Sequence, residues 1–283
     1  MLACRNWGAP LRYCMDVSSS VSSLGSVVAV PIAANRTSRL LTDGNATVMD
    51  DDAGTSVNVT LNKHRYSKFS ITGMGKALAG DLSARMAMNS AIAALLNGVE
   101  EDVLSLTTAG FSTCTALGTY ANALTEAVCT QAVSSVRMQR PPEGDELLGL
   151  VRPDILGWGA LEVLATFASA DYRGAGSNVL GEQVAGNGRV WHGARWICTG
   201  SLPRNSTSSD GIVMHRSAIA VAMRVPPVPV AGASAINVTD PQSGIAFQLV
   251  LSYNGSTLAD DVVAHTIYGY ATAKEPFGCQ LKY

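Results

Sequence analysis

The feature that most constrains this chain is a helical pattern that runs through residues 73–110. Apolar side chains recur there at three- and four-residue steps, the spacing that places them on one face of a helix. The members of this stripe are Leu78, Leu82, Met86, Ile92, Leu95, Leu96, Val99, Val103 and Leu106. A helix over residues 74–106 would be about 50 Å long, well beyond the three or four turns of most helices. We therefore predict a long central helix. The alternative is a shorter core helix with a frayed start, because Gly80 and Gly98 each weaken a helix by about 1 kcal/mol.

The charge and the apolar runs argue against two kinds of partner. The net charge of the 283 residues is −2 and only 15% of them are charged, whereas a nucleic-acid groove needs clustered Lys and Arg. The apolar run 27–34 is too short to span a bilayer. Residues 1–16 lack the continuous apolar core of a signal peptide. We expect a soluble chain that is not exported and does not bind a membrane.

The cysteines and the glycosylation triplets bear on the cellular compartment. None of the six cysteines forms a C-x-x-C pair, which argues against a zinc or redox motif. They are Cys4, Cys14, Cys114, Cys129, Cys198 and Cys279. We expect free and mostly buried thiols. Asn-x-Ser/Thr triplets, which a secreted protein could glycosylate, begin at Asn35, Asn45, Asn58, Asn205, Asn237 and Asn254. Without a signal peptide, we attribute them to a composition rich in Ser, Thr and Asn.

The rest of the chain mixes strands and helices without the regular spacing of parallel βαβ units. Residues 1–33 form an arm that must lie on another part of the molecule, and 34–72 form two extended limbs around a turn-rich tip. After the long helix we expect helices over 119–138 and 154–170, with a short one at 215–224. Further strands are predicted at 147–151, 211–214, 235–239, 245–253 and 278–283. This order indicates the α+β class.

No set of residues has the pattern of a catalytic, cofactor or metal site. The glycine runs 73–80, 174–181 and 186–193 resemble phosphate loops, but Gly75-Lys76 is followed by Ala77, which has no hydroxyl for a metal ion.

The four histidines, His64, His192, His215 and His265, are far apart, and no G-x-S-x-G turn marks a nucleophile. Residues 50–52 are three aspartates without the EF-hand spacing. His215 lies where a strand ends, a place that suits a structural cap. The sequence therefore predicts a chain that is not an enzyme and has no cofactor.

Four stretches, in this order, resemble the major capsid (major head) proteins of tailed bacteriophages, the HK97-like fold family. NKHRYSKFSITGMGKAL (62–78) is similar to the passage from the extended loop into the spine helix of that family. RPDILGWGALEVL (152–164) and GIVMHRSAIAVAMR (211–224) resemble segments of its axial domain. AFQLVLSYNGSTLADDVVAHTIYGY (246–270) resembles its long return strands. The resemblance covers nearly the whole chain.

The resemblance implies an HK97-like fold with five parts. They are an N-terminal arm (1–33), an extended β-hairpin loop (34–72), the spine helix of the peripheral domain (73–112), an axial domain (113–232), and return strands of the peripheral domain with a last axial strand (233–283). Glycine-rich residues 174–188 would adapt between rings of five and six subunits. Lys63 and Lys68 lie near the loop from which some relatives form a cross-link, but no asparagine partner is evident.

The implied function is structural. The chain would assemble with itself as pentamers and hexamers into the icosahedral head that encloses phage double-stranded DNA. Assembly in the host cytoplasm would involve a separate scaffolding protein, a portal and decoration proteins, and the product would be the virion capsid. Two alternatives stay open at this point: an encapsulin-type nanocompartment shell with an enzyme as cargo, and a secreted β-rich glycoprotein or adhesin.

Overall fold

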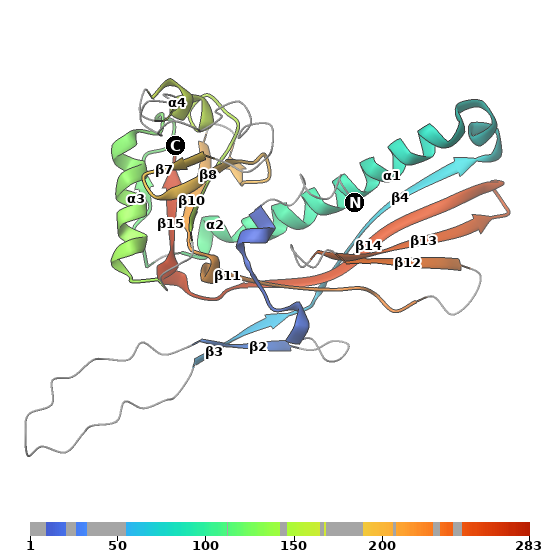
Figure 1. The fold of residues 1–283 in the computed structure, drawn as a ribbon, viewed down its shortest axis with the longest axis horizontal. Helices are drawn as coiled ribbons and strands as arrows, with labels where there is room; N and C mark the ends of the chain where they lie inside the picture. The colour runs from blue at the N-terminus through green and yellow to red at the C-terminus, as the bar shows by residue number, and fades with distance from the viewer. Residues whose placement is uncertain are drawn as a thin grey trace, which may run out of the picture.

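One long helix and two β-sheets organise the chain (Figure 1). The computed structural model describes residues 10–20, 27–32, 55–111, 113–141, 146–164, 167, 189–205, 208–228, 233–239 and 245–283. The helix lies along the first sheet and ends at the base of a lobe that contains the second sheet. The predicted α+β class is confirmed.

The long helix, α1, spans Gly73–Leu104 and is 32 residues long, about 48 Å. The predicted stripe is buried along the C-terminal half of α1, at Ile92, Leu95, Leu96, Val99 and Val103. Met86 is 65% exposed, and the side chains of Leu78 and Leu82 lie outside the described part. The helix is interrupted at Ser105 and followed by α2 (Leu106–Ala109). The prediction of a single long helix is confirmed.

The first sheet has six strands built around the longest one, β14. They are β1 (Met15–Asp16), β4 (Lys63–Thr72), β11 (Ile219–Arg224), β12 (Ala233–Thr239), β13 (Ala246–Asn254) and β14 (Ala259–Thr272). β4 pairs with one edge of β14, and β11 and β13 follow each other along the opposite edge. β12 continues the sheet beyond β13, and β1 adds a short parallel pair to β11.

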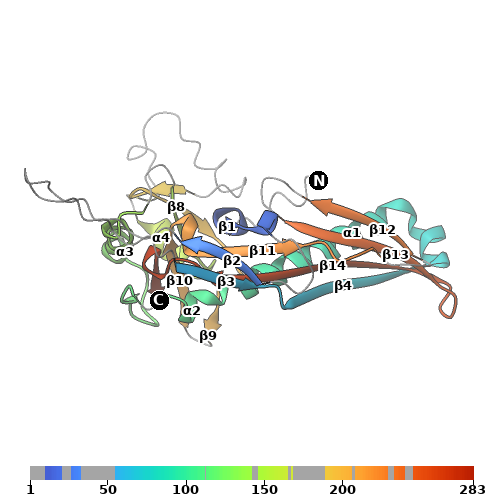
Figure 2. The same cartoon turned by 90° about the horizontal axis from the view of Figure 1, so that it is seen from below.

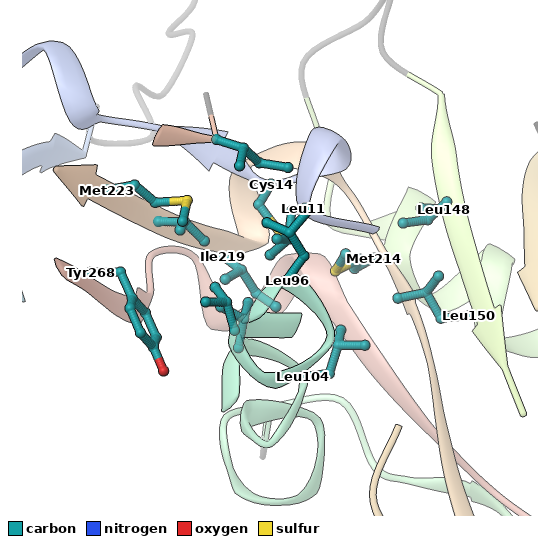
Figure 3. Close-up of a cluster of buried hydrophobic side chains, with 14 of the residues drawn as sticks. Leu11, Cys14, Leu96, Leu104, Leu148, Leu150, Met214, Ile219, Met223 and Tyr268 are labelled. Atoms are coloured by element: carbon teal, nitrogen blue, oxygen red, sulfur yellow. The ribbon is translucent and has the colours of Figure 1, made fainter. Parts of the chain in front are cut away.

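The two faces of the first sheet differ in side-chain size. On the face toward α1, Ile219, Val221 and Met223 of β11 join the main hydrophobic core. Figure 3 shows this core, where α1 meets β11, β6 of the second sheet and the segment around Leu11. On the opposite face β11 contributes the small side chains of Ala220 and Ala222 to a third cluster. The predicted helix over 215–224 is therefore wrong. The alternation of large and small side chains in residues 219–224 is the pattern of a strand buried on both faces.

The second sheet forms the lobe at the C-terminal end of α1. Its path is β5 (Leu117–Gly118), β15 (Gly278–Lys282), β10 (Ser208–Met214), β6 (Leu147–Val151), β8 (Ala194–Cys198) and β7 (Arg189–Trp191), with β9 (Arg204–Asn205) paired to β10. The predicted strands at 147–151, 211–214 and 278–283 are confirmed. A second hydrophobic core lies between this sheet and helix α3.

Two helices accompany this sheet. α3 (Glu126–Met138) confirms the C-terminal part of the helix predicted over 119–138, whereas 119–125 are not helical. The Thr125 side chain caps α3 by accepting a hydrogen bond from the Val128 N–H. α4 (Trp158–Val163) is much shorter than the predicted 154–170. Its start is delayed because the Asp154 carboxylate accepts from the Gly157 N–H at 2.6 Å and closes a turn instead. Short 3-10 turns, including η4 (Arg216–Ala218), link the remaining strands.

Two strands outside both sheets form a separate ribbon: β2 (Val27–Ile32) pairs with β3 (Thr55–Thr60). The first limb and most of the tip of the hairpin expected within 34–72 lie outside the described residues. The two strands described there, β3 and β4, do not pair with each other. The alternating valines of β3 instead match those of β2, which the prediction assigned to the arm. β11 likewise pairs with β14, so residues 219–224 belong to the first sheet although they lie within the range 113–232.

Candidate assembly surfaces

The ribbon of β2 and β3 lies on the face of the first sheet opposite α1, which we call the outer face (Figure 2). Val28, Val30 and Val59 are 5%, 4% and 0% exposed and pack in one cluster with Ala220 and Ala222 of β11. Small side chains on the sheet let the ribbon approach closely. Among the described residues, the ribbon therefore packs against the sheet on one side and has no core of its own.

Gly269 of β14 is the point of closest approach between the ribbon and the sheet. A Cβ atom at this position would lie 2.2 Å from the Thr60 carbonyl oxygen, 2.7 Å from its carbon and 3.0 Å from the Leu61 nitrogen. All three are backbone atoms, so no side-chain rotation could relieve the overlap. The crossing therefore requires glycine for space, not for an unusual backbone angle.

A polar network fastens β4 to α1 on the other face. Arg65 Nη2 lies 3.1 Å from Asp102 Oδ1, and Lys63 Nζ lies 3.5 Å from Asp102 Oδ2. The Tyr268 hydroxyl also donates to this carboxylate. Desolvation alone would raise the pKa of Asp102, but hydrogen bonds from Tyr268 and Arg65 and the charges of Arg65 and Lys63 outweigh it and lower the pKa. The network sets the position of β4 along α1.

A row of hydrogen-bonded side chains crosses four strands of the outer face. His64 Nε2 lies 3.0 Å from His265 Nδ1, and His265 Nε2 lies 3.1 Å from Gln248 Oε1. Gln248 Nε2 then donates to Asn237 Oδ1 at 2.9 Å. Because the Gln248 amide nitrogen donates to Asn237, the Gln248 amide oxygen is the atom that faces His265 and accepts from it. A neutral His265 therefore carries its proton on Nε2. Burial, followed by the proximity of His64, lowers the pKa of His265.

Exposed apolar side chains gather at the end of the sheet far from the lobe. Ile236 on β12 and Leu251 and Tyr253 on β13 are 63%, 48% and 65% exposed. The antiparallel register, in which Ile236 opposes Leu249, places them on one face of the sheet. This is the face that carries α1, so the three residues form an apolar ledge beside the helix. Large apolar surfaces left in water often mark sites of protein association.

The opposite end of the molecule has a second exposed apolar group around α4. Ile155 and Val163 are 86% and 85% exposed. Ile155 lines a hollow of about 530 Å³ together with Trp158, Glu162 and Arg204. Both ends of the chain's long axis therefore present apolar side chains to solvent.

The structure brings together few of the residues weighed from the sequence. His192 pairs with Glu126 at 2.8 Å, and His215 caps η4 by accepting from the Ser217 N–H, as the sequence suggested. The glycine run 73–80 is the start of α1. Residues 174–181, 186–188 and 50–52 lie outside the described residues, whereas 189–193 form β7 and the turn that follows it. Within the described residues no group of three His, Cys, Asp or Glu could hold a metal ion. Of the four histidines, only His64 and His265 contact each other, and the sequence analysis did not predict this contact.

The remaining candidates are structural in this fold. Lys63 contacts Asp102 and the Tyr270 hydroxyl, and Lys68 forms an ion pair with Asp261 at 2.8 Å. The cysteines that the structure describes are free thiols, namely Cys14, Cys114, Cys129, Cys198 and Cys279, and Cys4 lies outside that part. Of the asparagine triplets, Asn35 and Asn45 also lie outside it. No helix in the described ranges is both long and apolar enough to cross a membrane.

Solved structures with this arrangement are viral and bacterial shells. The structure of Mycobacterium phage Che8 matches with a TM-score of 0.58 and 16% identity over 91% of this chain and 84% of that chain. The capsid of Ralstonia phage GP4 matches with a TM-score of 0.57 and 13% identity over 98% and 89%. This chain has the HK97-like fold. No family model matches the sequence, and no curated protein matches it significantly.

The same fold occurs in shells that are not phage heads. The SrpI encapsulin of Synechococcus elongatus matches with a TM-score of 0.55 and 10% identity over 97% of this chain and 86% of that chain. At these identities the likeness establishes the HK97-like fold, and with it the fold resemblance found in the sequence.

Proposed function

We propose that this chain is the major capsid protein of a tailed bacteriophage, a structural and non-catalytic subunit of the icosahedral head. The observation that carries the proposal is the HK97-like fold over 91% and 98% of the chain in the two phage comparisons. The subunit's own surfaces support it. A ribbon held on one side and apolar groups at both ends need further surfaces to cover them, and neighbouring copies of the chain would supply these.

The parts of the fold then take separate roles in the shell. The first sheet and α1 form the peripheral domain, the second sheet with α3 and α4 forms the axial domain, and the ribbon of β2 and β3 is the root of the extended loop. Around five- and sixfold axes the axial domains would pack as pentamers and hexamers. The ledge of Ile236, Leu251 and Tyr253 would be covered at the periphery of each ring.

Assembly in the host cytoplasm would require further proteins of the head. We include a scaffolding protein, a portal and decoration proteins among the partners, with double-stranded DNA enclosed without sequence-specific binding. A net charge of −2 supports enclosure over tight binding, because phosphate contacts would need clustered cations. The mature location would be the virion capsid.

The encapsulin-type shell is the second candidate, and the match to the SrpI encapsulin favours it. The β-rich adhesin has no such support, because the fold is that of shells. DNA content distinguishes the two shell types. Shells isolated from the native source, treated with nuclease and then disrupted, should release protected double-stranded DNA. Shells that release a protein cargo and no DNA would favour the encapsulin.

A further inference from the structure

Two cysteines far apart in the sequence meet at the edge of the second sheet. Cys114 lies in the segment after α2, and Cys279 lies in β15. Cys114 Sγ is 3.7 Å and Cys279 Sγ is 4.0 Å from the same acceptor, the carbonyl oxygen of Thr115. Burial, and after it the neighbouring Cys114 thiol, raises the pKa of Cys279. The two thiols therefore lie around one carbonyl oxygen, near each other.

The strand pairing explains why the two thiols meet. β5 and β15 run parallel, with Leu117 opposite Leu281. Cys279 precedes Leu281 by two residues, and Cys114 precedes Leu117 by three, so the pairing carries both cysteines to the same end of the ladder. Gly118, at φ +89°, lies against the Lys282 carbonyl and lets β5 follow the edge closely. The contact is thus fixed by backbone register.

The two thiols differ in exposure, and this difference determines which of them reacts first with a reagent in solution. Cys114 is half-buried, whereas Cys279 is 0% exposed. A reagent in water would therefore meet Cys114 first, with Cys279 behind it. Among the described residues, Cys14, Cys129 and Cys198 have no hydrogen bond to another thiol.

We propose that Cys114 and Cys279 are a redox pair that a small disulfide, such as oxidised glutathione, converts into a disulfide bond. The Cys114 thiolate attacks one sulfur of the oxidant, forms a mixed disulfide and expels one glutathione thiolate. The Cys279 thiolate then attacks the Cys114 sulfur and expels the second glutathione. Two protein thiols are oxidised, one glutathione disulfide is reduced to two thiols, and the two protons pass from protein to glutathione.

The bond would join the segment that follows α2 to the last strand of the chain. It would close a loop that contains the whole path from β5 to η5 (Glu275–Phe277), and long loops gain the most from a cross-link. We expect the melting temperature to rise by about 5 °C or more and to return on reduction. In a phage head, the pair would stay reduced during cytoplasmic assembly and close after release; this timing alone depends on the proposed function.

Mass spectrometry of the full-length chain tests the pair. The protein, assembled or not, is incubated with oxidised glutathione, its free thiols are blocked in denaturant, and it is digested without reductant. We expect a peptide that links Cys114 to Cys279 and that dithiothreitol removes. Cys279→Ser should accumulate a glutathione adduct on Cys114, the trapped intermediate. Cys198→Ser is the matched control, because Cys198 is also half-buried, and should keep the linked peptide.

Two results would overturn the proposal. One is the absence of the linked peptide with both cysteines recovered as free thiols. The other is a linked peptide that pairs either residue with a different cysteine. Both results are read from peptide masses, so the test applies equally to a chain that does not assemble into shells. A failure of the proposed function therefore does not change the outcome of this test.

Discussion

Replacing Gly269 by alanine tests how the ribbon is attached to the sheet. The added Cβ would lie 2.2 Å from the Thr60 oxygen, within a crossing made of backbone on both sides. β14 cannot move away easily, because Gly269 is paired with Ala222 of β11. The end of β3 must therefore lift from the outer face.

The cost follows from the side chains that hold the ribbon down. Val28, Val30 and Val59 are buried, and full burial of a valine contributes about 1.5–3 kcal/mol. Complete detachment would thus cost roughly 5–9 kcal/mol, which is an upper bound because the unfolded chain is already compact. Lifting one end exposes only part of this surface. We expect Gly269→Ala to lower the free energy of unfolding by about 2–4 kcal/mol.

Urea unfolding of the full-length chain, followed by circular dichroism, measures this loss, and limited proteolysis should show faster cleavage near β3. Gly255→Ala is the matched control. Gly255 lies in the turn between β13 and β14, and nothing lies within 4 Å of a Cβ there, so its effect should stay within about 0.5 kcal/mol. Equal unfolding free energies for the two variants would refute the proposed close crossing.

Three further predictions concern single side chains. Asp102→Asn should cost about 1–2 kcal/mol near neutral pH, because Tyr268 and two cations lose a charged acceptor; it should also flatten acid denaturation, since the lowered pKa of Asp102 gives stability that is lost as the pH falls through and below about 4. Burial and the neighbouring His64 lower the pKa of His265, so the folded state binds fewer protons than the unfolded state and stability should fall as the pH drops below about 6.5. The urea midpoint of His265→Gln should therefore change less between pH 7.5 and 5.5 than that of the unsubstituted chain. An equal change in midpoint for the two proteins would contradict this. Thr125→Ala removes the cap of α3 and should cost about 1 kcal/mol in the same unfolding assay, whereas a loss within error would mean that the cap is not formed.

Local periodicity was enough to predict the longest elements. The apolar stripe from Leu78 to Leu106 predicts α1, and the apolar run 147–151 is recognisable as the buried strand β6. The α+β class follows from such patterns, because they depend on neighbours a few residues apart in the sequence.

Pairings between distant segments were harder to predict. The valines of β2 alternate in the same way as those of β3, so the sequence indicates that each segment is a strand. The alternation does not indicate which strand each one pairs with. The sequence predicts a short helix over 215–224, although the large–small alternation of 219–224 is the pattern of a strand between two packed layers.

The row on the outer face could not be found from spacing. His64 and His265 are 201 residues apart and meet only through the antiparallel register of β4 with β14. Gly269 likewise looks like an ordinary strand glycine until β3 crosses it. Contacts of this kind depend on strand register and on how segments cross in the tertiary fold, and they cannot be predicted from composition or local spacing.

The central claim is that this chain builds a closed shell, and electron microscopy of the purified native assembly tests it most directly, with sedimentation beside it. The account predicts uniform icosahedral shells tens of nanometres across, with rings of five and six subunits and DNA inside. A chain that stays a stable monomer, even when a phage scaffolding protein is supplied, would contradict it.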